Sequence, residues 1–188
     1  MSARAVFLDK DGTLVEDVPM NVDPDRITMR PGAAEALGRL RDAGYQLAVV
    51  SNQAGVALGA FPERALEAVV ERLRTLLDAA GVQLEGFYYC PHHPAGTVPE
   101  YRLECGCRKP APGLVLSAAR ALGASVEDSW MVGDILDDVE AGRRAGCRTV
   151  LLDTGGETEW NVTPARTPDF IATSFGQVAD YILAEQRS

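Results

Sequence analysis

Short apolar segments alternate with segments of helical periodicity along the whole chain, and this alternation constrains the fold more than any other feature. The apolar segments are continuous runs, which is typical of strands that are buried on both faces. The expected strands are residues 5–9, 45–52, 86–90, 129–134, 148–154 and, at an edge, 168–174. The expected helices are residues 31–43, 62–80, 112–122, 136–145 and 176–186. This order predicts an α/β fold, a doubly wound three-layer sandwich with a mainly parallel, Rossmann-like sheet.

Length and charge bound the domain organisation and the partners. The 188 residues are enough for one domain, residues 1–188, with a sizeable core. The net charge of −9 argues against a nucleic-acid partner or an acidic membrane surface. The sequence contains no apolar run of transmembrane length and no secretory signal, so we expect a cytoplasmic protein. We expect it to act as a monomer.

Polar residues stand where three of the expected strands end. Asp9, Ser51 and Asp134 each fall at the carboxyl end of a strand, and these ends meet at one edge of a parallel sheet, where ligands bind. Asp11 follows Asp9 by two residues, and carboxylates this close repel each other. The segment from Asp9 to Gly12, taken alone, is as typical of a turn as of a functional site.

Phosphoryl transfer would give these residues a common purpose. A carboxylate can attack a phosphoryl group and form an aspartyl-phosphate. Mg²⁺ prefers a few carboxylates together with phosphate oxygens of the substrate, so Asp9, Asp11 and Asp134 are its candidate ligands. Lys109 would add positive charge on the transferred group, and Ser51 a hydroxyl. The pattern therefore indicates a Mg²⁺-dependent phosphohydrolase.

Four segments resemble, in order, the motifs of the haloacid dehalogenase (HAD) superfamily of phosphohydrolases. They are FLDKDGTL (7–14), VVSNQAG (49–55), CRKPAPG (107–113) and MVGDILDD (131–138). The resemblance implies that Asp9 is the nucleophile and that Asp11 is the general acid and base. It also implies that Ser51 binds the phosphate and that Lys109 stabilises its charge. Asp134 and the backbone carbonyl of Lys10 would be further Mg²⁺ ligands. Asp138 would contact these groups without touching the metal or the substrate. Asp137 is expected to be solvated.

The segment 88–110 contains both histidines and three of the four cysteines. Cys90 and His92, with Cys105 and Cys107, form two pairs at the spacing of a tetrahedral Zn²⁺ site. Four protein ligands would leave no open position, so this zinc would be structural, and Cys107 would hold the loop that carries Lys109. His93 is the alternative to His92, and the isolated Cys147 is expected in the core.

The same segment, YYCPHHPAG followed by CGCRKPAPG, resembles the D-glycero-D-manno-heptose-1,7-bisphosphate 7-phosphatases. This implies a role in heptose biosynthesis and a small anionic sugar phosphate as substrate, with Arg108 on the second phosphate. The implied substrate contacts are Asp17, Val18, Pro19, Met20, Ser51, Asn52, Gln53, Ala54, Arg108 and Lys109. Two features depart from the family pattern: Ile135 stands where some relatives are basic, and EDVPMNVD replaces a loop with histidine and tyrosine.

No cap domain is expected, because the expected strands, helices and zinc loop take up the segments between the motifs. Substrate selectivity would therefore come from loops.

Three other functions stay open. The first is hydrolysis of histidinol phosphate or another small phosphomonoester. The second is a receiver-like signalling module, against which Asp11 argues, since a neighbouring base shortens the life of an aspartyl-phosphate. The third is a zinc-loop binding protein.

Overall fold

The computed structural model describes residues 3–186 and contains one six-stranded sheet with the order β3-β2-β1-β4-β5-β6, in which every neighbouring pair is parallel. The strands are β1 (Arg4–Leu8), β2 (Tyr45–Asn52), β3 (Gly86–Cys90), β4 (Trp130–Gly133), β5 (Arg148–Leu152) and β6 (Phe170–Ala172). The helices are α1 (Ala33–Asp42), α2 (Leu66–Asp78), α3 (Gly113–Leu122), α4 (Leu136–Ala145) and α5 (Phe175–Glu185). The predicted fold class is confirmed.

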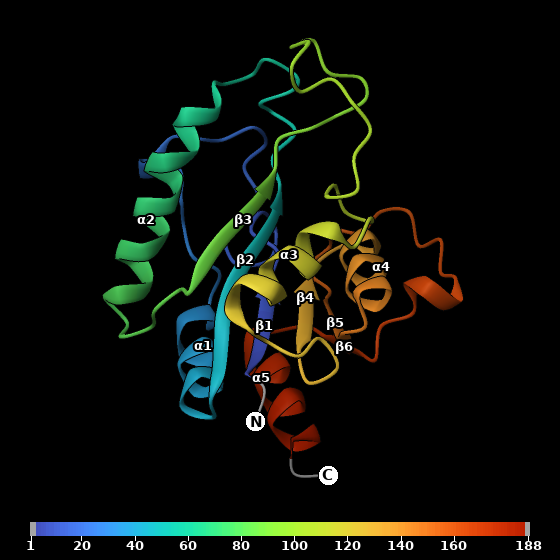
Figure 1. The fold of residues 1–188 in the computed structure, drawn as a ribbon. Coiled ribbons are helices and arrows are strands. Elements are labelled where there is room, and N and C mark those ends of the chain that lie inside the picture. The colour runs from blue at the N-terminus through green and yellow to red at the C-terminus, as the bar shows by residue number, and fades with distance from the viewer. Residues whose placement is uncertain (1–2, 187–188) are drawn as a thin grey trace.

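Helices cover both faces of the sheet (Figure 1), and each face has its own hydrophobic cluster. Val6 and Leu8 of β1 pack with residues of α1, α2 and α5, whereas Ala5 and Phe7 pack with residues of α3 and α4. Successive side chains of a strand point to opposite faces, so a strand covered on both sides must be apolar throughout. This explains the continuous apolar runs in the sequence.

The expected long helix at residues 62–80 is shorter in the structure. A 3-10 turn (Glu63–Ala65) precedes α2, and it is closed by a hydrogen bond from the N–H of Ala65 to the carbonyl of Pro62, 2.9 Å long. The tight i to i+3 bond takes up residues that helical periodicity alone assigns to the α-helix.

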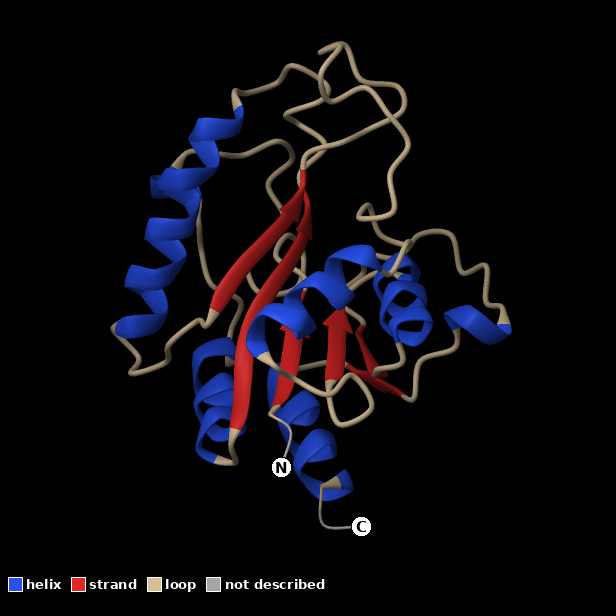
Figure 2. Ribbon diagram, in the orientation of Figure 1, coloured by secondary structure: helices blue, strands red, loops and turns tan. Residues whose placement is uncertain are grey.

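The carboxyl ends of β1, β2 and β4 lie together because the strands are in close register. Leu8 is opposite both Val49 and Val132, so Asp9, Ser51 and Asp134 emerge at the same edge of the sheet. Long loops rise from this edge in Figure 2, including the segment between β3 and α3. Within residues 3–186 this segment and the one after β1 hold no inserted cap domain, as predicted. In the same part of the chain, no helix has the length and apolar character needed to span a membrane.

Two helical glycines predict opposite effects on stability. A Cβ atom on Gly142 of α4 would lie 2.5 Å from Cβ of Met131 and 2.8 Å from Cγ2 of Thr149, so Gly142→Ala should lower the free energy of unfolding by about 1–3 kcal/mol. A Cβ atom on Gly38 of α1 would meet only Val82, at an ordinary 3.8 Å, so Gly38→Ala should raise it by about 0.5–1 kcal/mol. Urea unfolding measures both, and equal effects would contradict the close approach of α4 to the sheet.

Candidate active site

Three buried carboxylates, which we call the carboxylate cluster, meet at the carboxyl edge of the sheet. Asp9 follows β1, Asp134 follows β4, and Asp138 lies in the first turn of α4. Each offers an oxygen atom, and these atoms lie within 4.8 Å of one another. Such a group of buried negative charges requires positive charge nearby.

Lys109 supplies part of that charge. Its ammonium lies 2.7 Å from Oδ1 of Asp9 and 2.6 Å from Oδ1 of Asp138, and the residue is 3% exposed. Burial lowers the pKa of Lys109, but the charges of Asp138 and Asp9 outweigh this effect and raise it. Burial, followed by the charge of Asp9, raises the pKa of Asp134 to about 7. One ammonium among three carboxylates leaves negative charge that is not balanced within the cluster.

Thr13 is a member of this site that the sequence analysis did not select. Its hydroxyl is completely buried and lies 3.4 Å from Oδ2 of Asp9 and 3.1 Å from Oδ1 of Asp134, so it can donate to either carboxylate. Its place four residues after Asp9, just past a glycine in a turn, was the available signal. Gly12 has φ of +79°, and a Cβ atom there would lie 2.3 Å from Oδ2 of Asp134. The turn after β1 therefore packs directly against Asp134.

The carbonyl of Lys10 does not have the place that the resemblance implied. It accepts hydrogen bonds from the N–H groups of Leu14 and Val15, each 3.0 Å long. These bonds direct the oxygen into the turn and use both of its lone pairs. The structure therefore does not offer this carbonyl to the carboxylate cluster.

The Asp11 side chain has different surroundings from Asp9. Its carboxylate accepts from the ammonium of Lys10 and, over 3.2 Å, from Nε2 of Gln53, and its oxygens are not among those that form the carboxylate cluster. Burial raises the pKa of Asp11, against the opposing charge of Lys10. Of the three predicted Mg²⁺ ligands, the structure brings Asp9 and Asp134 together with Asp138, and holds the Asp11 side chain apart.

The end of β2 links the remaining predicted groups. Nε2 of Gln53 also lies 2.7 Å from Oγ of Ser51, so one amide contacts both Ser51 and Asp11. The side chain of Asn52 accepts from the backbone N–H of Lys109 and donates to the backbone carbonyl of Lys109, both over 3.0 Å. From the sequence, Asn52 was expected only as a substrate contact. Its hydrogen bonds to Lys109 leave no local signal, because the two residues lie 57 positions apart in the chain.

Two small cavities adjoin at this edge, because Asp11, Asp17 and Asn52 line both. One, of about 220 Å³, is lined by Asp9, Asp11, Asp17, Asn52, Lys109, Asp134, Ile135, Asp138 and Gly156. The other, of about 230 Å³, is lined by Asp11, Asp17, Val18, Pro19, Met20, Asn21, Asn52, Gln53, Ala54, Gly55 and Phe61. The predicted substrate residues 17–20 and 52–54 thus surround the second cavity. Arg108 lines neither, and its Nη1 is buried without a hydrogen-bond partner among residues 3–186.

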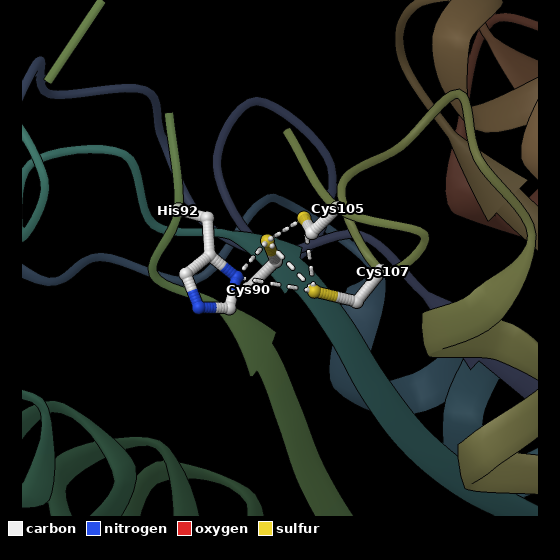
Figure 3. Close-up of side chains that lie close together, drawn as sticks. All are labelled: Cys90, His92, Cys105 and Cys107. Carbon is white, nitrogen blue, oxygen red and sulfur yellow. Dashed lines mark hydrogen bonds between the residues drawn. The ribbon is translucent and has the colours of Figure 1, made fainter. Parts of the chain in front are cut away.

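The predicted zinc ligands also converge (Figure 3). Sγ of Cys107 lies 3.1 Å from Sγ of Cys90, 3.3 Å from Sγ of Cys105 and 3.4 Å from Nδ1 of His92. Ligand atoms about 2.3 Å from a tetrahedral zinc are roughly 3.8 Å apart, so the four groups need only a small expansion to surround one ion. Nδ1 of His93 instead accepts from the N–H of Ala95, over 3.1 Å, which favours His92 as the ligand.

Cys147 lies apart from these groups. It is 6% exposed and packs in the hydrophobic cluster beneath α3 and α4, as expected for a core cysteine.

A parallel sheet with this carboxylate cluster and an ion-paired lysine defines a HAD-like phosphohydrolase. A family model described as HAD-hydrolase-like matches residues 106–178. The chain is 37% identical over 188 residues to the D-glycero-β-D-manno-heptose-1,7-bisphosphate 7-phosphatase of Escherichia coli (strain K12), covering 99% of this chain and 97% of that one. The chain belongs to the D-glycero-D-manno-heptose-1,7-bisphosphate 7-phosphatase family and is a phosphoric monoester hydrolase.

Solved structures agree with this assignment. A HAD-like phosphatase from Mesorhizobium loti superposes with a TM-score of 0.85 at 34% identity, covering 97% of this chain and 87% of that one. A D,D-heptose 1,7-bisphosphate phosphatase from B. bronchiseptica, complexed with magnesium and phosphate, superposes with a TM-score of 0.77 at 29% identity, covering 97% and 99%.

Asn52→Ala should loosen the backbone that carries Lys109, because it removes two hydrogen bonds to that residue. We expect amide hydrogen exchange in residues 107–111 to accelerate by about fivefold or more, the effect of losing about 1 kcal/mol. Asn21→Ala is the matched control, since the side chain of Asn21 makes hydrogen bonds only to the backbone of Asp23 among the described residues. Unchanged exchange in Asn52→Ala would contradict the hold on Lys109.

Proposed function

We propose that this enzyme removes the 7-phosphate of D-glycero-D-manno-heptose 1,7-bisphosphate through an aspartyl-phosphate on Asp9, with Mg²⁺ as cofactor. The observation that carries the proposal is the division between the two aspartates after β1. Asp9 is ion-paired with Lys109 and lies in the carboxylate cluster, whereas Asp11 faces the same cavity with a pKa raised by burial. One carboxylate is placed to attack and the other to carry a proton.

The donors present fit a hard divalent cation. Three buried carboxylates face one ammonium, and Mg²⁺ prefers such oxygen donors. Asp9 and Asp134 would hold it; Asp11 remains a candidate, although its side-chain contacts favour proton transfer. When bound, Mg²⁺ would reduce the repulsion between the attacking carboxylate and the phosphoryl oxygens. The magnesium and phosphate bound to the B. bronchiseptica relative support this assignment.

The side chains would then divide the reaction as follows. Asp9 attacks phosphorus, and the bond to the leaving oxygen breaks while Asp11 gives that oxygen its proton. Lys109 and the hydroxyl of Ser51 stabilise the charge on the transferred group. Asp11, now ionised, takes a proton from water, and the water oxygen attacks the phosphorus of the aspartyl-phosphate and releases Asp9. Thr13 orients Asp9 throughout.

Substrate selection would rest on the second cavity. Residues 17–20 and 52–54 line it. Arg108 lines neither cavity, so its buried Nη1 would have to turn toward the substrate to bind the phosphate that is not transferred. Two departures from the family pattern also line the cavities: Ile135 lines the first, and residues 17–21 of the loop EDVPMNVD (16–23) line the second. We propose a small anionic sugar phosphate as the only partner of a monomeric, single-domain cytoplasmic enzyme that binds neither nucleic acid nor membrane, in line with its net charge of −9.

We also propose that Cys90, His92, Cys105 and Cys107 hold a structural Zn²⁺. All four ligand atoms face one point, and four protein ligands leave no open position for a reaction. Cys107 precedes Arg108 and Lys109 directly, so the metal would restrain the loop from one side while Asn52 holds it from the other.

A panel of substrates tests the activity. It contains both anomers of heptose 1,7-bisphosphate, histidinol phosphate, fructose 1,6-bisphosphate and an aryl phosphate. We expect kcat/KM for one heptose anomer to exceed that for the compounds without heptose by at least about 100-fold, because the others leave groups of the site unpaired.

Asp9→Asn should lower kcat by at least about 10⁴-fold while the protein stays folded. A preference for histidinol phosphate would replace the heptose assignment, and an active Asp9→Asn enzyme would exclude Asp9 as nucleophile.

Metal analysis tests the zinc site. The purified enzyme should hold about one zinc per chain, and Cys105→Ser should lose it, because one of four ligands is missing. Cys147→Ser is the control; it removes a cysteine from the core and should retain the metal. A wild-type enzyme without zinc would refute the four-ligand site.

A further inference from the structure

We propose that residues 153–157, the segment that follows β5, act as a clasp on the carboxylate cluster, and that Glu157 is the positioning residue that anchors it. The inference rests on the proposed function in one respect, namely that Asp134 binds the divalent cation. Glu157 would not touch substrate or metal. It would hold the backbone next to Asp134, so that the Asp134 carboxylate is in place before the cation binds.

The start of α4 needs a partner that its own sequence does not supply. The first residues of a helix have backbone N–H groups without intrahelical acceptors. The residue before α4 is Ile135, whose side chain cannot accept a hydrogen bond. Asp138 of α4 accepts from the N–H of Ile135 over 3.4 Å, but within residues 3–186 no side chain of α4 accepts from the N–H of Leu136. Oε2 of Glu157 accepts from the N–H of Leu136 over 2.7 Å, from 21 residues further along the chain. A negative charge at this position also interacts favourably with the helix dipole.

Glu157 is itself held in place. Its other oxygen, Oε1, accepts from the N–H of Glu159 over 2.7 Å. Burial raises the pKa of Glu157, but hydrogen bonds from the backbone of Leu136, Glu159 and Thr158 outweigh this and lower it. The carboxylate therefore stays ionised in its contact with α4.

Two neighbours of Glu157 touch the site directly. A Cβ atom on Gly156 would lie 2.0 Å from Oδ2 of Asp134, so the segment passes against that carboxylate with no room for a side chain. The hydroxyl of Thr154 donates to the carbonyl of Gly12 over 3.2 Å, in the turn that follows Asp9. The segment therefore contacts the turn after β1, the Asp134 side chain and the start of α4.

The hydrogen bond between Leu136 and Glu157 also restricts the movement of Asp134. Only Ile135 separates Asp134 from Leu136, so fixing the N–H of Leu136 limits how far the backbone of Asp134 can move. Gly156 packs against Oδ2 of Asp134, and the Thr13 hydroxyl contacts its Oδ1, so both oxygens of the carboxylate have neighbours. Without Glu157 the first turn of α4 would fray more readily, and the Asp134 carboxylate would have to be ordered when the cation binds.

Three variants test the clasp. Glu157→Ala removes the acceptor, Glu157→Gln keeps one oxygen for Leu136, and Glu159→Ala changes an exposed carboxylate of the same loop that makes no hydrogen bond or ion pair within residues 3–186. Amide exchange of residues 134–138 is measured in metal-free protein. Mg²⁺ binding is measured by calorimetry, and kcat is measured as a function of Mg²⁺ concentration.

In Glu157→Ala we expect exchange to accelerate and the Mg²⁺ dissociation constant to rise, each by about five- to tenfold, the size of a lost helix cap. At saturating Mg²⁺ kcat should change less than twofold, roughly, because no reacting group is removed. Glu157→Gln should stay within about twofold of wild type in every measurement, and Glu159→Ala should match wild type.

Failure of the clasp and failure of the proposed function would give different results. A Glu157→Ala enzyme that loses thermal stability but keeps its Mg²⁺ affinity would reduce Glu157 to an ordinary helix cap and overturn the inference. Unchanged exchange at residues 134–138 would overturn it as well. If the wild-type enzyme has no Mg²⁺-dependent phosphatase activity, the proposed function fails instead, and exchange together with calorimetric Mg²⁺ binding still decides whether the clasp exists.

Discussion

The ion pairs of Lys109 with Asp9 and Asp138 are the interaction on which the rest of the site depends. Lys109 is 3% exposed, and its ammonium lies within 2.7 Å of both carboxylates. Removing Lys109 would leave two buried carboxylates without their counter-charge, which is strongly destabilising. The pairs also bring together three segments that are distant in the sequence: the turn after β1, the first turn of α4 and the loop before α3. Asp134 stays unpaired with any ammonium among the described residues, and this is the charge that a divalent cation would balance.

Because Lys109 lies on a loop, its position has to be imposed from outside the loop. Asn52, at the end of β2, binds both the N–H and the carbonyl of Lys109, and the thiol and imidazole groups of the proposed zinc site converge just before Arg108. Asp134 is in a similar situation at the end of β4, where Gly156 packs against its carboxylate and Glu157 accepts from the N–H of Leu136, two residues further along the chain. In both cases a rigid strand end or a packed loop restrains a charged side chain, so that less ordering remains to be done when ligand binds.

The positions of the strand-end residues could be predicted from the sequence. Asp9, Ser51 and Asp134 end buried strands, and the parallel order of the sheet then forces them to one edge. Thr13 was missed because its place four residues after Asp9 is only a weak signal, and its contact with Asp134 joins residues 121 positions apart in the chain. The implied metal contact of the Lys10 carbonyl was wrong, since local bonds from Leu14 and Val15 direct that oxygen into the turn.

The sequence by itself determined the fold class, the four motifs and the two pairs of sulfur and nitrogen ligands, because apolar periodicity and residue spacing act locally along the chain. Only the tertiary structure decided which groups meet. Asp138 lies against Lys109, Gln53 connects Ser51 to Asp11, and Glu157 caps a helix that begins 21 residues before it. These contacts depend on how loops from separate strands pack at one edge of the sheet. Hydrogen bonds between residues so far apart follow from the packing of the whole fold and leave no periodic signal in the sequence.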